Sequence, residues 1–309
     1  RTVERLTRLI PAGPSASRSA RASSVAVLRR SAQEAPAWVA RITGLNRAAQ
    51  QVTETTRVSV VDRAGLVRAS TRALRGLMEQ VPAPRASEAV RLVGAAEVAG
   101  AMSVLATRLL GQVVPASPAW HEGRSDAVRL GGEQSSTALP GAVAPHPLLV
   151  APNVLAMRRQ LDLDILDLPA WVCLHEMTHA VQLAAAPWLG PYLSDSMRMV
   201  IGAVVEAAYG GAGSAGSAGS AGSADGAGNA GPQVRGRRPQ RGRAVRIAAR
   251  AGRGRVLEGL MNVTDRSEVA SLADALTFLE GHAEVVLDDV HPNRMPSVHR
   301  LRAVLSRSR

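Results

Sequence analysis

Apolar residues recur with helical spacing over much of the chain. This spacing predicts helices at 24–43, 64–80, 86–111, 169–186 and 267–289. The third helix carries a stripe formed by Leu92, Val98, Met102, Leu105 and Leu109. Two short apolar runs, VSVVD at 58–62 and LLV at 148–150, instead predict extended segments. Residues 1–23 are rich in Arg, Ser, Ala and Pro, and we expect them to be loose apart from a short helix at Val3–Ile10.

The distribution of these patterns divides the chain into three parts. A helical N-terminal region at 1–115 is followed by a loop connection at 116–146, which is rich in Gly, Ser and Pro, and by a region at 147–309. An insertion at 210–255 interrupts the last region. It begins with GGAGSAGSAGSAGSADGAGNAG, which cannot bury a core, and we expect it to be disordered.

Composition favours a mainly α fold with minor β structure. Aromatic residues make up only 2% of the chain, so the core must consist mostly of Leu, Val, Ala and Ile, which suits packed helices. Cys173 is the single cysteine, which excludes an intramolecular disulfide and fits a reducing, cytoplasmic compartment. No apolar stretch is long enough to span a membrane. Because the chain begins at Arg1 rather than a methionine, we expect it to lack its true N-terminus.

The formal net charge of +12 is mainly a local property. Between Val234 and Arg255 there are nine arginines and no acidic residue. The rest of the chain then holds 28 basic (37 − 9) against 25 acidic residues, which leaves about +3. We therefore do not expect nucleic-acid binding by the folded part; only the Arg-rich tract at 235–255 could contact phosphates or an acidic partner.

The stretch WVCLHEMTHAVQ at 171–182 carries the clearest chemistry. His175 and His179 lie four residues apart and therefore on one helix face, so both imidazoles can reach one zinc ion at about 2.0–2.1 Å. Glu176 lies beside the metal without binding it, where it can act as general base towards a zinc-activated water. The rest of this helix, which Asp167 and Pro169 begin, is nearly all apolar, so polar residues in it need partners.

A hydrolytic zinc site needs a third protein ligand. The metzincin pattern is excluded because glycine would be needed at 182 and histidine at 185, where the chain has Gln182 and Ala185. The segment FLEGHAEVVLDD at 278–289 offers Glu280, His282 and Glu284. The two glutamates share a helix face, so one can bind zinc while the other accepts a hydrogen bond from a ligand histidine. If His282 is the ligand instead, both glutamates turn away.

Two resemblances bear on this choice. The Glu-Gly-x-Ala-Glu element at 280–284 resembles the third-ligand helix of the gluzincin metallopeptidases, such as bacterial collagenases, which implies Glu280 as ligand and Glu284 beside a ligand histidine. The stretches at 148–189, 278–290 and 295–302 resemble the bacterial zincin-like metallopeptidase family, hydrolases of which some are labelled as associated with deazaflavin coenzyme biosynthesis. The stretches at 37–45 and 60–70 resemble its N-terminal half. Members carry an aromatic residue at the position of Leu183 and continue beyond Arg309, so we expect a truncated C-terminus.

We therefore predict a mainly α, zincin-like metallohydrolase domain with a helical N-terminal half. It would bind Zn²⁺ and hydrolyse an amide or peptide bond. The candidate donors to the transition state are His282, His291, Tyr192 and Tyr209, and spacing selects none of them. An alternative is a non-catalytic, zinc-stabilised scaffold or regulatory protein in a coenzyme pathway. In that case His282 or another side chain would fill the position of the water.

Overall fold

The computed structural model describes residues 10–79, 81, 88–114, 127–129, 144–209 and 266–307. The insertion expected at 210–255 and almost all of the short helix expected at Val3–Ile10 lie outside these residues. So does most of the loop connection expected at 116–146.

The prediction of a mainly α fold is confirmed. The helices are α2 (Arg18–Thr43), α3 (Asn46–Thr55), α4 (Arg63–Met78), α5 (Glu88–Ala106), α6 (Ala151–Gln160), α7 (Asp167–Ala185), α8 (Leu189–Tyr209), α10 (Arg266–Asp288) and α11 (Val298–Arg307). Five of them match the helices that the apolar spacing predicts. The other four, α3, α6, α8 and α11, were not predicted. The expectation that residues 1–23 are loose is wrong for 18–23, because α2 begins at Arg18, where the hydroxyl of Ser17 accepts the N–H of Ala20 and caps the helix.

The helix predicted at 86–111 is too long, because α5 ends at Ala106. Asn153 explains this end: its side-chain amide donates hydrogen bonds to the carbonyls of Ala106 and Leu109, at 2.8 and 2.6 Å. The carbonyl of Ala106 is one of those that the end of a helix leaves without a partner, and that of Leu109 lies in the segment that follows. The chain then continues as strand β2 (Gly111–Val114) instead of a further helical turn.

A small mixed sheet lies beside the helices, with the strand order β2-β4-β1-β3. Its two central strands, β1 (Arg57–Val61) and β4 (His146–Val150), are parallel, and each edge strand is antiparallel to its neighbour. The extended segments predicted at 58–62 and 148–150 are these central strands. Strand β3 (Ala127–Arg129) lies within the segment that the sequence assigns to a loop connection.

Successive side chains of β4 point to opposite faces of the sheet and belong to two separate clusters of buried apolar residues. Leu149 belongs to a cluster around α7, which also includes Leu28, Leu174 and Met177. Leu148 and Val150 belong to a second cluster with residues of α4 and α5. The sheet is therefore covered by α7 on one face and by α4 and α5 on the other.

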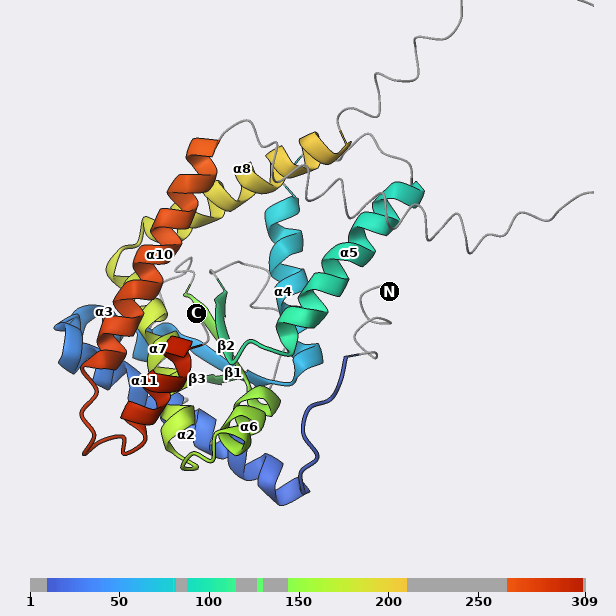
Figure 1. Cartoon of the computed structure of the whole chain (residues 1–309). Coiled ribbons are helices and arrows are strands. Elements are labelled where there is room, and N and C mark those ends of the chain that lie inside the picture. Colours follow the sequence, from blue (N-terminus) through green and yellow to red (C-terminus); the bar gives the residue numbers. More distant parts are fainter. Residues whose placement is uncertain are drawn as a thin grey trace, which may run out of the picture.

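Helix α7 packs against elements from both halves of the chain; in Figure 1 it is partly hidden behind α10. It contacts α2, α3 and α10 as well as strands β2 and β4. Asp167 is its first residue; its buried carboxylate does not cap the helix but accepts the backbone N–H of Ser297 at 2.6 Å. This bond attaches the segment after α10 to the start of α7. No helix in the described residues is long and apolar enough to cross a membrane.

Candidate metal centre

Helix α7 places His175 and His179 one turn apart on the side that faces α10. Their Nε2 atoms lie 3.2 Å from each other, and the two rings are perpendicular. Both side chains are largely buried, with exposed fractions of 25% and 14%. The helical spacing that the sequence shows therefore brings two imidazole nitrogens to a common point.

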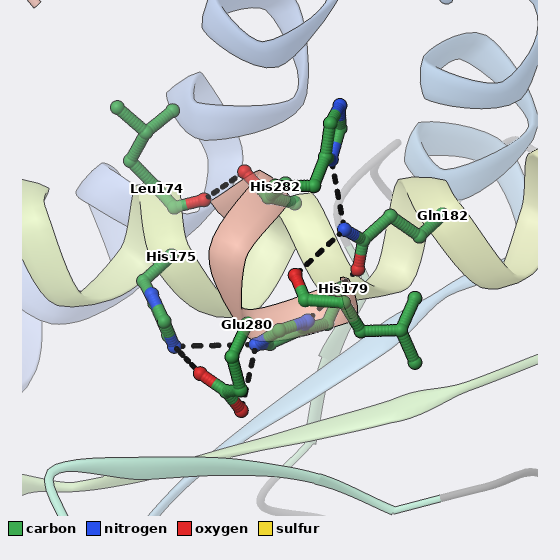
Figure 2. Close-up of polar contacts among 8 residues, drawn as sticks. Leu174, His175, His179, Gln182, Glu280 and His282 are labelled. Atoms are coloured by element: carbon green, nitrogen blue, oxygen red, sulfur yellow. Dashed lines mark hydrogen bonds and ion pairs between the residues drawn. The ribbon is translucent and has the colours of Figure 1, made fainter. Parts of the chain in front are cut away.

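Glu280 of α10 supplies the third group. Its Oε2 lies 3.3 Å from Nε2 of His175, and its Oε1 lies 3.5 Å from Nε2 of His179. Figure 2 shows the three side chains pointing towards one another from the two helices. Among the described residues, these three form the one group of side chains with the spacing of metal ligands.

These distances fit zinc. Ligands held at 2.0–2.1 Å in a tetrahedron lie about 3.3–3.4 Å apart. The two Nε2 atoms lie 3.2 Å apart, and each lies 3.3–3.5 Å from one of the two carboxylate oxygens of Glu280, which is close to this value. Two imidazoles and one carboxylate are also a donor set that zinc uses in catalytic sites, which leaves a fourth position for water or substrate.

The electrostatics of the three groups agree with this geometry. Hydrogen bonds from His175 and His179 hold the pKa of Glu280 well below its usual range, although burial opposes them. Burial lowers the pKa of His179, but the contacts with Glu280 and Gln182 and the nearby carboxylate of Glu176 outweigh it, so the pKa is raised. The carboxylate of Glu280 is thus charged at neutral pH, as a metal ligand must be.

Glu176 lies next to the donors but is not one of them. Only 6% of its surface is exposed, and burial raises its pKa to about 7, while the two histidines lower it and Glu280 raises it. A carboxyl group with such a pKa can both accept and release a proton near neutral pH. Gly111 at the start of β2 packs against it, since a Cβ at this glycine would lie 2.5 Å from Oε1 of Glu176.

Gln182, one turn beyond His179, determines which ring nitrogen of His179 carries the proton. Its side-chain amide Nε2 donates to the carbonyl of Leu279 at 3.0 Å and to Nδ1 of His282 at 2.8 Å. Because a carbonyl can only accept, the amide orientation is unambiguous, and Oε1 accepts from Nδ1 of His179 at 2.9 Å. The proton of His179 is then on Nδ1, which leaves the lone pair of Nε2 directed at the metal position.

The remaining predicted residues lie around this group. His282 contacts Gln182 rather than the three donors. Glu284 is half-buried one turn after Glu280, and its contact with a ligand histidine stays a prediction. His291 lies in the turn after α10, where its Nδ1 accepts the N–H of Asn293. Tyr192 is on α8, and the side chain of Tyr209 lies outside the described residues.

A cavity of about 700 Å³ opens directly beside the donors. His175, Glu176, His179 and Glu280 all contribute to its wall. His282, His291 and Tyr192 are not among the described residues of this wall, and a role for any of them as transition-state donor stays a prediction. A substrate in this cavity would reach the fourth metal position.

Two functional residues were missed by reasoning from the sequence. For Gln182 the signal is its position, because an amide one turn after a ligand histidine is a suitable hydrogen-bond partner for that histidine. Gly111 carries a weaker signal, a glycine between apolar residues, which can mark a close approach of the backbone to another group.

Comparisons with known proteins bear on the family of the chain. A family model described as zincin-like metallopeptidase matches residues 3–309. A search of curated proteins found no match. One similar solved structure, a "putative hydrolase with a novel fold" from Chloroflexus aurantiacus, is 18% identical, with a TM-score of 0.37. The match covers 69% of this chain and 66% of that chain, just under two thirds of its length.

Proposed function

Because this chain belongs to the zincin-like metallopeptidase family, we propose that it is a zinc-dependent hydrolase of an amide or peptide bond. His175, His179 and Glu280 would bind the zinc. The observation that carries the proposal is the convergence of two Nε2 atoms, 3.2 Å apart, on the carboxylate of Glu280, whose two oxygens lie 3.3 and 3.5 Å from them, next to a buried carboxylate and an open cavity.

The roles of the side chains follow from their positions. Zinc, when bound, supplies a Lewis acid that polarises the scissile carbonyl and makes water nucleophilic at neutral pH. Glu176 accepts the proton of the attacking water and returns it to the leaving amine, for which a pKa near neutrality is suited. Gln182 keeps His179 in the tautomer that can bind metal. Gly111 leaves the space that the carboxylate of Glu176 occupies.

The cavity supports hydrolysis over a purely structural zinc. A non-catalytic module needs a fourth protein ligand in place of the water. Among the described residues, the group that could hold a metal has three members, and His282 makes its hydrogen bond to Gln182. The donors also border open space rather than a closed shell of side chains.

Metal analysis and two substitutions test the proposal. The purified protein should contain about one zinc per chain, and His175→Ala should lose it. Glu176→Gln should retain zinc but abolish hydrolysis of a fluorogenic peptide library and of N-acyl anilides. Glu34→Gln, the same change on an exposed side chain of α2, is the matched control and should leave both unchanged. Full zinc occupancy with equal turnover in the Glu176→Gln protein would contradict the assigned role.

A further inference from the structure

The cavity beside the donors is apolar over most of its wall. Away from the donors, aliphatic and methionine side chains come from helices α4, α5, α8 and α10; examples are Leu74, Met102, Leu105, Met197, Ile201 and Leu276. Apart from the two histidines, Trp171 is the one aromatic residue among the described lining residues. Flexible aliphatic and thioether side chains adapt to chain-like apolar groups rather than to one rigid shape.

Charged groups are few in this wall. Among the described lining residues they are Arg108, Glu176 and Glu280, besides the donor histidines. Glu176 and Glu280 belong to the site already described, and Arg108 is exposed. The polar side chains of Ser70 and Gln112 are hydrogen-bonded to each other at 3.0 Å. Away from Arg108 and the site, a charged substituent would therefore lose its hydration without meeting an oppositely charged group among the described lining residues.

The size of the cavity indicates the size of the group. A volume of about 700 Å³ falls in the range of about 300–1,000 Å³ that holds whole small ligands. The cavity is continuous with the donors, so an occupant can extend along the apolar wall while its carbonyl stays at the metal position. Leu105 and Leu276, on two different helices of the wall, are 44% and 38% exposed. Apolar surface of this kind gains stability when a ligand covers it.

We propose that the substrate carries a long, uncharged aliphatic group next to the scissile amide bond, and that this group occupies the cavity. The inference rests on the proposed function, because it places the scissile bond at the three donors. Two sources share this chemistry: the acyl chain of an N-acyl amide, and the large aliphatic side chains of a peptide.

Straight-chain hydroxamic acids test the proposal on the zinc-loaded protein. Their head group binds zinc while the chain length varies, and calorimetry measures the dissociation constant from two to ten carbons. Affinity should rise about fourfold per methylene, which corresponds to about 0.8 kcal/mol for a buried CH₂, until the cavity is filled. Binding of the two-carbon compound with no gain from longer chains would overturn the aliphatic site while leaving the zinc site intact.

A pair of neighbouring substitutions locates the effect. Leu105→Glu places a carboxylate in the cavity wall and should remove most of the gain with chain length. Val104→Glu makes the same change one residue earlier, at a side chain that is 61% exposed and is not part of the wall, and should keep the gain. If affinity rises equally per methylene in both variants, the chain binds to another surface and the proposal is overturned.

A second series separates this inference from the zinc chemistry. N-methyl alkanamides of the same lengths lack a strong metal-binding group and are titrated into the zinc-free protein. Affinity that rises with chain length, and is lost in Leu105→Glu, supports the aliphatic site even if zinc fails to bind. A flat series without zinc refutes it. Rates of cleavage of N-decanoyl-glycinamide and of a Leu/Met tripeptide amide then distinguish the two sources of the chain.

Discussion

Gln182 offers the sharpest test of how the two helices cooperate at the site. Gln182→Met keeps the length of the side chain but removes its three hydrogen bonds, to His179, Leu279 and His282. His179 then loses the acceptor that holds its proton on Nδ1. Either ring nitrogen can carry the proton in the variant, and the imidazole is free to rotate away from the metal position.

The magnitude follows from the lost bonds. Removing such a partner of a ligand histidine weakens metal binding about 10- to 100-fold, or roughly 1.4–2.8 kcal/mol. The buried acceptor on Leu279 and the ring nitrogen of His282 also lose their donor, which lowers the free energy of unfolding of the metal-free protein by about 1–3 kcal/mol. The two losses are measured separately, the first as a zinc dissociation constant and the second as a denaturant midpoint.

The assay is competition for zinc with a chromophoric chelator, together with ¹⁵N spectra of the histidine rings. Gln182→Glu restores an acceptor for Nδ1 of His179 but not the two donors, so it should recover zinc affinity without recovering stability. Gln51→Met repeats the change at an exposed position on α3 and should alter neither. A zinc affinity within twofold of the wild type for Gln182→Met would refute the reasoning.

Three further predictions concern the surroundings of the site. Gly111→Ala should keep zinc but lower the rate of hydrolysis on the order of 100-fold, because its Cβ displaces the carboxylate of Glu176. The control Gly190→Ala, whose Cβ meets no atom, should leave the rate unchanged. Asn153→Leu should lower the free energy of unfolding by about 2–4 kcal/mol, measured in urea, since the carbonyls of Ala106 and Leu109 and the side chain of Arg63 lose their partner. With free zinc at 100 times its dissociation constant, bound zinc should raise the free energy of unfolding by about 2.7 kcal/mol, and a chelator should remove this gain. A melting temperature that the chelator leaves unchanged would count against a bound metal.

Local periodicity accounts for the part of the site that the sequence predicts. His175, Glu176 and His179 occupy one turn of one helix, so their relative placement needs no knowledge of the rest of the fold. Glu280 required a resemblance, because spacing within 278–289 left Glu280 and His282 as alternatives. The structure brings Glu280, not His282, to the histidines.

What the sequence could not predict depends on partners far along the chain. The apolar stripe continues to Leu109 and predicts a helix to 111, but the side chain of Asn153 and pairing with β4 end the helix earlier. Tertiary contacts therefore decide where this helix ends, and they outweigh the local helix propensity. Gln182 is a similar case, because its contacts with Leu279 and His282 span 97 and 100 residues.

This long separation has a consequence for the order of folding. Contacts between residues about a hundred positions apart require closure of a long loop, so they form slowly and late. The ligands on α7 can be aligned as soon as that helix forms, whereas Glu280 arrives only when α10 docks. An interaction that is absent from the folding transition state acts mainly on the rate of unfolding. We therefore expect zinc to slow unfolding much more than it speeds folding, so that bound metal lengthens the lifetime of the native protein.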